Sequence, residues 1–189
     1  MSQDSRAAQE MQYCSAILAK SGTSVLLRIL PQADLSTYQQ YPEGGVYDPA
    51  SGAQWFYHCH DDSAALGEHG HFHCFVRPDG PESEPVHLIA IGVDAHGQPL
   101  RLFTVNQWVV GGGYYDAGQT NALLERFNVE MALPDYLVNR WLTACLSRYE
   151  DEIITLNKAR DTALNADPRP LQEVLADRKI EVLSELRLS

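Results

Sequence analysis

The chain has 189 residues, of which 44% are hydrophobic and 21% charged, and it carries a formal net charge of −11. Such an acidic chain lacks the basic surface that a nucleic-acid backbone or an anionic membrane requires, and no apolar run is long enough to cross a bilayer. We expect one domain over residues 1–189. We place it in the cytoplasm, because the N-terminus is polar and acidic where a secretory signal would be basic and then apolar.

Helices are predicted at the N-terminal end, within residues 1–30. Between Arg6 and Lys20 apolar residues recur every three or four positions, as in an amphipathic helix, and Ser21-Gly22 follows as a stop signal. The short apolar segment from Thr23 to Leu30 is expected to form a second helix that ends before Pro31. The next stretch, YPEGGVYDPASGA, contains two prolines and three glycines and is expected to be an irregular loop.

Four strands are predicted in the middle of the chain, at residues 54–60, 69–77, 86–93 and 100–106. The segments that separate them are short and rich in turn-forming residues. Connections this short favour antiparallel neighbours over parallel crossovers. We therefore expect a four-stranded antiparallel meander over residues 54–106.

The C-terminal part, residues 117–187, is predicted to be helical. Thr120 is the expected N-cap of a first helix, a longer helix runs from about Pro134 to Leu164, and the last runs from about Pro170 to Leu186. Strands grouped in the middle with helices at both ends of the chain predict an α+β fold in which the helices cover one face of the sheet.

Five of the seven histidines lie within sixteen residues of the first two predicted strands: His58, His60, His69, His71 and His73. Side chains alternate between the faces of a strand, so the histidines of each strand share one face. If the two strands pair, all five lie on the same face. Cys59 and Cys74 then point to the opposite face as packing residues, and all four cysteines are expected to be free thiols.

Imidazoles from two adjacent strands can meet at one ion, with metal–nitrogen bonds of about 2.1 Å. An all-imidazole set suits Zn, Fe, Cu or Ni, and three such ligands leave a position for water or substrate. The row from His69 to His73 spans about 13 Å, so either one member is not a ligand or two ions are bound. Glu68, Asp61 and Asp62 are neighbours that can complete the shell, orient a ring or move protons.

Two other interpretations compete with a metal site. A purely structural cluster needs a partner for every buried ring nitrogen, which is costly for five histidines, although it is the ordinary expectation for His87 and His96. The segment HGHFHCF also resembles the histidine-triad nucleotide hydrolases, in which the middle histidine, here His71, would attack phosphorus. That family has no use for His58 and His60.

Several longer segments also resemble one uncharacterised family: YPEGGVYDP, WFYHCH, GEHGHFHCFVRP, HLIAIGVDAHGQPLRLFTVNQWV and VNRWLTACL. The family is bacterial, mainly proteobacterial, with similar YPxGDVYDP, YYHAH, GEHGHFHTFLR and VNRW segments, and the resemblance spans residues 41–146. It implies that the five histidines and Glu68 are family features that share a site, and it implies no activity. The chain departs from the family pattern at Gly45, Cys59, Cys74 and Gln107, where the family has Asp, Ala, Thr and Arg. The last difference removes a basic candidate for anchoring a substrate.

These patterns together predict a protein that binds a transition metal, Fe, Zn or Cu, through the five clustered histidines. The leading hypothesis is a metalloenzyme that acts on a small molecule by redox or hydrolytic chemistry, with Glu68 and Tyr57 as candidate catalytic residues. An open coordination position beside a pocket lined by Tyr57, Trp108, Tyr114 or Tyr115 would favour the enzyme. A closed four-ligand shell would favour a sensor, a carrier or an assembly partner instead.

Overall fold

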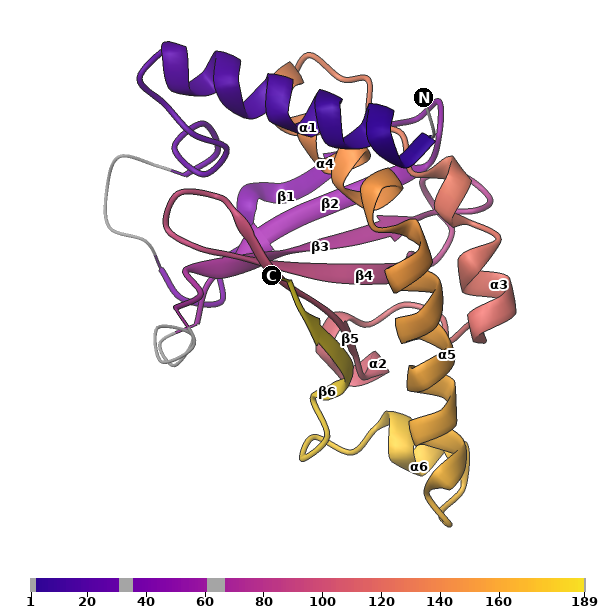
Figure 1. The fold of residues 1–189 in the computed structure, drawn as a ribbon. Helices are drawn as coiled ribbons and strands as arrows, with labels where there is room; N and C mark the ends of the chain where they lie inside the picture. The colour runs from indigo at the N-terminus through magenta and orange to yellow at the C-terminus, as the bar shows by residue number, and fades with distance from the viewer. Residues whose placement is uncertain (1–2, 31–35, 61–66, 189) are drawn as a thin grey trace.

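One antiparallel sheet organises the computed structural model, which describes residues 3–30, 36–60 and 67–188. Six strands of the described chain follow one another across the sheet in sequence order (Figure 1). They are β1 (Tyr41–Tyr47), β2 (Ala53–His58), β3 (Gly70–Val76), β4 (Val86–Val93), β5 (Pro99–Val105) and β6 (Val182–Arg187). The α+β class and the antiparallel meander are confirmed, but the prediction of four strands was wrong because both edge strands were missed.

The first edge strand, β1, lies where the glycines and prolines predicted an irregular loop. Its register against β2 shifts between Tyr41, which faces Tyr57, and Val46, which faces Trp55. The residues that absorb the shift include Gly44 and Gly45, both at positive φ (78° and 72°). Glycine adopts this conformation readily, and an edge strand tolerates both a bulge and a proline. The turn-forming residues therefore shape an irregular edge strand.

The other edge strand, β6, replaces most of the helix predicted from Pro170 to Leu186. Only α6 (Leu171–Leu175) is helical there. The chain then returns along β5, where Thr104 lies opposite Ser184 and their hydroxyl oxygens are 2.7 Å apart. The partner strand β5 lies about eighty residues earlier in the chain. The residues of β6 themselves therefore indicate a strand only through a weak alternation of apolar residues.

The helices at the two ends of the chain agree in part with the prediction. Helix α1 (Gln3–Lys20) ends at the expected stop, whereas Thr23–Leu30 forms successive turns instead of a second helix. The long helix expected after Pro134 is two helices, α4 (Tyr136–Arg148) and α5 (Glu150–Ala166), interrupted at Tyr149, where φ is −108° and ψ is 25°.

Three short helical elements connect β5 to α4. They are α2 (Gln107–Val110), α3 (Ala117–Asn121) and the 3-10 turn η2 (Leu124–Arg126). Helix α3 begins at Asp116, whose side chain caps it by accepting from the backbone N–H of Gln119, so the prediction of Thr120 as N-cap was wrong. No helix in the described ranges is both long and apolar enough to span a membrane.

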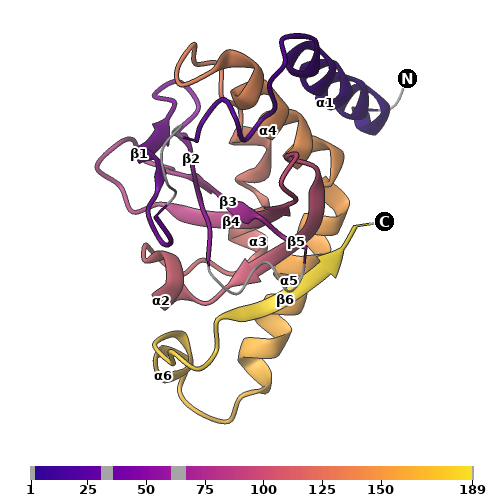
Figure 2. The ribbon, with the colours of Figure 1, turned by 90° about the vertical axis from the view of Figure 1, so that its left-hand side faces the viewer.

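The sheet separates a large apolar layer from a polar one. On one face, α1 and α4 cover the central strands, and Trp141 of α4 packs against Phe72 of β3 with 5.9 Å between ring centroids (Figures 1 and 2). On the other face, α2 packs Val109 and Val110 against a smaller apolar cluster on β4 and β5. The prediction that helices cover only one face therefore holds for α1 and α4 but not for α2. The clustered histidines of β2 and β3 lie on the same face as α2.

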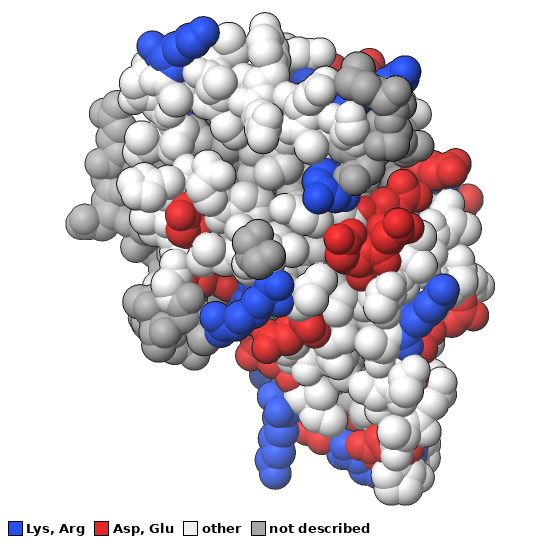
Figure 3. Space-filling view, viewed as in Figure 1, with Lys and Arg blue, Asp and Glu red and all other residues white. Residues whose placement is uncertain are grey.

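The surface reflects the acidic composition, with 25 acidic and 14 basic residues in the whole chain. On the side of the molecule seen in Figure 3, the basic side chains lie apart from one another, and acidic side chains stand between several of them. This side therefore presents no continuous basic patch.

A buried asparagine ties α4 to the sheet and provides a test of the fold. The side-chain oxygen of Asn139 accepts from Trp55 Nε1 at 3.0 Å, and its amide nitrogen donates to the carbonyls of Met131 and Leu133. Asn139→Ala leaves these buried groups without partners and should lower the free energy of unfolding by about 2–4 kcal/mol in denaturant titrations. The control Asn165→Ala, at an exposed position of α5, should change it by less than about 0.5 kcal/mol. Equal effects of the two substitutions would contradict the packing of α4 on the sheet.

Candidate metal centre

The pairing of β2 with β3 brings the histidines of the two strands together. His58 lies directly opposite His71, and His73 lies opposite Phe56. Since side chains alternate along both strands, His58, His71 and His73 share one face. His60 follows the end of β2, and its ring stacks on that of His71 with centroids 5.1 Å apart. Four of the five predicted ligands therefore meet at one place.

The Nε2 atom of His58 is the centre of this histidine cluster, which we define as His58, His60, His71 and His73. It lies 2.7 Å from Nε2 of His71, 3.1 Å from that of His73 and 3.4 Å from that of His60. For metal–nitrogen bonds of about 2.1 Å, these separations correspond to angles of roughly 80–110° at the metal, as in octahedral and tetrahedral sites. His58, His60 and His71 form the tightest trio, with their ring nitrogens all within 4.8 Å of one another.

Hydrogen bonds alone do not account for the three short contacts of His58 Nε2. A neutral imidazole carries one N–H, so Nε2 of His58 cannot form good hydrogen bonds to three other ring nitrogens at once. Protonation is unfavourable as well: burial, followed by the proximity of His71 and His60, lowers the pKa of His58 to about 3. Burial also lowers the pKa of His73 well below its ordinary value. His58 and His73 are therefore neutral rings, and the ring nitrogens of the cluster converge in an arrangement that a cation would stabilise.

Glu68 fixes the orientation of His71. Its Oε1 lies 3.0 Å from Nδ1 of His71, so that nitrogen carries the proton and Nε2 directs its lone pair into the cluster. Arg101 holds the same carboxylate through Nε, 2.5 Å from Oε2, and Nη2, 3.3 Å from Oε1. Burial alone would raise the pKa of Glu68, but the hydrogen bonds from His71 and Arg101 outweigh burial and lower it. Glu68 is therefore a carboxylate that orients an imidazole.

Glu68 reaches His71 because β4 has a glycine beneath it. Gly92 lies between His71 of β3 and Arg101 of β5, and a Cβ atom at this position would collide with the carboxylate of Glu68. Arg101 and Gly92 were not predicted as site residues. Finding them requires knowing that β3, β4 and β5 are neighbours and in which register they pair.

His87 is a third residue of the site that was not predicted from the sequence. Its Nε2 lies 3.0 Å from Nδ1 of His73, so it supports His73 much as Glu68 supports His71. Burial is the first cause that lowers the pKa of His87 to about 3, followed by the proximity of Arg160 and His71. The sequence around His87 does not indicate this contact, because the register of β4 against β3 shifts at a bulge between Cys74 and Phe75.

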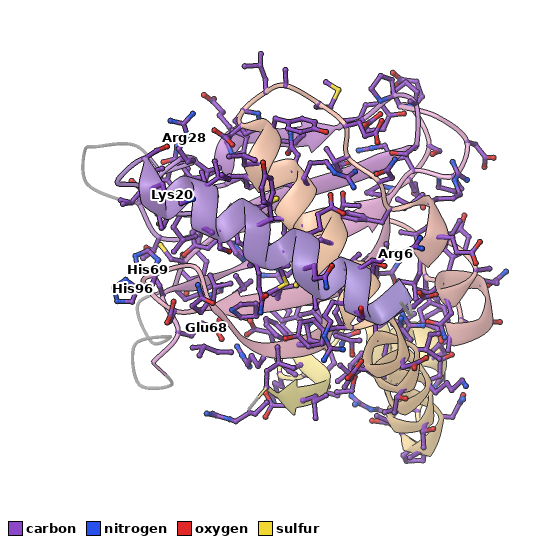
Figure 4. All side chains as sticks on the ribbon, turned by 45° about the horizontal axis from the view of Figure 1, so that its top comes forward. Arg6, Lys20, Arg28, Glu68, His69 and His96 are labelled. Atoms are coloured by element: carbon purple, nitrogen blue, oxygen red, sulfur yellow. The ribbon has the colours of Figure 1, made fainter. Side chains whose placement is uncertain are left out.

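His69 does not join the cluster, which corrects the prediction of five histidines on one face. Its Nδ1 lies 2.6 Å from the hydroxyl oxygen of Tyr57, whose ring belongs to the core beneath α1 and α4. Alternation fails here because β3 begins only at Gly70, so His69 precedes the regular strand. Figure 4 shows Glu68, His69 and His96 near one another at one end of the sheet. Tyr57 is fully buried on the helix side, away from the cluster.

The exposed side of the cluster opens into a hollow of about 460 Å³. Its lining includes three histidines of the cluster together with aromatic, aliphatic and charged side chains: Tyr38, His58, His60, Glu68, His71, Arg101, Phe103, Trp108, Val109, Glu181 and Val182. Of the four aromatic residues predicted to line a pocket here, only Trp108 does so. Tyr114 and Tyr115 line a separate, smaller cavity near Arg160. Asp61 and Asp62 lie outside the described residues.

The contact between Glu68 and His71 can be tested by an isosteric change. Glu68→Gln removes the negative charge that holds the Nδ1 proton of His71, so the affinity for a transition metal should fall about 10- to 100-fold in competition with a chromophoric chelator. Gly92→Ala should have a similar effect by displacing the carboxylate. Glu125→Gln, an exposed residue of η2, is the matched control and should leave the affinity unchanged. An unchanged affinity in Glu68→Gln would show that Glu68 does not orient a ligand.

Comparison with known proteins supports the resemblance seen in the sequence motifs. A family model described as a domain of unknown function, DUF6969, matches residues 5–188, which is nearly the whole chain. No curated protein and no solved structure matches the chain. The chain belongs to the DUF6969 family, an uncharacterised family as expected from its motifs.

Proposed function

We propose that the protein binds one transition-metal ion through His58, His60 and His71, and that it acts as a metalloenzyme on a small molecule in the adjoining hollow. The observation that carries this proposal is the convergence of ring nitrogens on Nε2 of His58, at 2.7–3.4 Å. Nitrogens at these separations suit ligands of one ion, and Nε2 of His58 cannot form good hydrogen bonds to all three neighbours at once.

The surroundings support a site that stays open to a substrate. His58, His60 and His71 all line the hollow, so an ion held by them would face that space. Three protein ligands and an open position are typical of a catalytic site, at which the ion polarises a bound oxygen or exchanges electrons. The all-imidazole donor set favours Fe, Zn or Cu over Mg or Ca, which prefer oxygen ligands.

Glu68 has a positioning role in this proposal. Both of its oxygens are engaged, one by His71 and Arg101 together and the other by Arg101. A carboxylate held in this way has little freedom to remove a proton from a substrate. Tyr57 has no part in the proposed site, because it lies on the other face of the sheet.

His73 distinguishes the two hypotheses of enzyme and metal carrier. Its Nε2 is 3.1 Å from that of His58, and it is completely buried, on the side of the cluster away from the hollow. With His73 as a fourth ligand, a tetrahedral ion would be closed, as in a carrier or sensor. With His73 outside the shell, or with a five- or six-coordinate ion, a substrate position stays open.

The histidine-triad hydrolase is less well supported. A nucleophilic imidazole needs a free lone pair pointing at substrate, whereas Nε2 of His71 points at His58 from 2.7 Å. His71 as a whole residue is also only 6% exposed. His58 and His60 have no role in that chemistry and a direct one in metal binding.

Elemental analysis of protein purified without a histidine tag tests the proposal. The wild type should carry, or take up on reconstitution, about one equivalent of a transition metal, and His58→Ala and His71→Ala should retain less than about a tenth of it. His69→Gln and the exposed His96→Gln are the controls and should keep the metal, although the sequence alone groups His69 with the ligands. Circular dichroism checks that each variant folds. A wild type that holds less than a tenth of an equivalent after reconstitution would refute the metal site.

A further inference from the structure

We infer that the hollow beside the histidine cluster takes a small molecule that carries a flat ring and is neutral or positively charged beyond its metal-binding atom. This inference rests on the proposed function, because the metal ion supplies the point at which an oxygen or nitrogen of the ligand attaches. It concerns the class of molecule that the rest of the hollow accepts.

The walls of the hollow favour a flat ring. Tyr38 and Trp108 present aromatic side chains to it, Phe103 lies largely covered behind Arg101, and Val109 and Val182 add aliphatic surface. The indole N–H of Trp108 donates to the carbonyl of Ile180 at 2.7 Å, so this residue offers its ring and no free donor. Tyr38 packs its ring edge-on against His60, with centroids 4.6 Å apart, and so places an aromatic surface next to a proposed ligand. Such walls bind planar apolar groups by burial and stacking.

Arg101 is the one basic residue among the residues described as lining the hollow, and its guanidinium is already engaged. Nε and Nη2 contact Glu68, and Nη1 lies 3.0 Å from Glu185 of β6. The flat side of the group lies over Phe103, with Cζ 4.0 Å from the ring centroid. Only 14% of the side chain is exposed. An anionic group of a ligand would have to displace a carboxylate to reach this arginine.

Glu68 and Arg101 pair with each other, so the remaining charged side chain of the hollow is acidic. Glu181, the residue directly before β6, lines the hollow and is exposed. The segments outside the described residues contain no lysine or arginine that could add a positive charge. Arg178 lies over the ring of Trp108, with Cζ 5.9 Å from the ring centroid, and is not among the residues described as lining the hollow. Once the metal-binding group of a ligand compensates the charge of the ion, Glu181 favours a cationic tail on that ligand over an anionic one.

Three catechols that differ only in the charge of a short tail provide the test. Dopamine, ethylcatechol and dihydrocaffeate share one metal-binding ring and carry a positive, neutral or negative tail. They are titrated without oxygen into cobalt(II)-loaded full-length protein, followed by the visible spectrum of the ion, and metal content is measured before and after. Dopamine should bind about tenfold more tightly than dihydrocaffeate, because a unit charge several ångströms away at the protein surface changes affinity about threefold.

Variants distinguish the effect of the Glu181 charge from that of the aromatic wall at Trp108. Glu181→Lys should abolish or reverse the preference for dopamine, whereas Glu125→Lys, the same charge change on η2, should retain it. Trp108→Ala should weaken all three catechols by a similar factor. Equal affinities in the wild type, or tighter binding of dihydrocaffeate, would overturn the charge preference, and unchanged affinities in Trp108→Ala would overturn the role of the aromatic wall. Protein that takes up no cobalt would contradict the proposed function itself, which the metal content reveals before any titration.

Discussion

The register between β2 and β3, which places His58 directly opposite His71, is the constraint on which the candidate site depends. A shift of one residue would send every side chain of one strand to the other face and separate the two rings. The register is held from the opposite side of the sheet, where Trp55, Tyr57 and Phe72 are buried beneath the helices. The same alternation thus fills the apolar core on one face and assembles the cluster on the other. The packing of the apolar core thus sets the positions of the clustered histidines from the opposite face of the sheet.

The buried, converging imidazoles of the cluster carry a cost in folding free energy that a bound cation would offset. Nε2 of His58 lies too close to three other ring nitrogens to form good hydrogen bonds to all of them, and burial lowers the pKa values of His58, His71 and His73 and so disfavours their protonation. The chain supports this arrangement with residues from other strands: Glu68 and Arg101 hold His71, and His87 contacts His73. Arg101 also contacts Glu185, so the last strand is linked to the cluster through one continuous set of ion pairs. A ligand that binds only the folded state stabilises it, and a metal ion would do so here.

Much of the site could be predicted from local alternation, and its failures have a common cause. His58, His71 and His73 lie on regular paired strands, where alternation holds, and their shared face was predicted correctly. His69 precedes β3, so alternation places it wrongly, and the chain turns it away from the cluster. Glu68 also precedes β3 and was predicted as a neighbour of the cluster that can orient a ring, and the chain turns it toward His71. The pairing of β3, β4 and β5 brings three further residues to the site: Arg101, Gly92 and His87. No short sequence motif indicates this pairing. The same limit applies to the fold: β6 is stabilised by β5, its distant partner in sequence, and its own residues suggest a helix as readily as a strand.

X-ray absorption spectroscopy of the metal-loaded protein tests whether the clustered imidazoles bind the ion, because it reports the atoms bound to the metal. We expect at least three nitrogen scatterers at about 2.0–2.1 Å, with the outer-shell pattern of imidazole rings, and the loss of imidazole scattering in His58→Ala. A first shell of mainly oxygen or sulfur atoms, or an imidazole pattern that is unchanged in His58→Ala, would contradict this expectation.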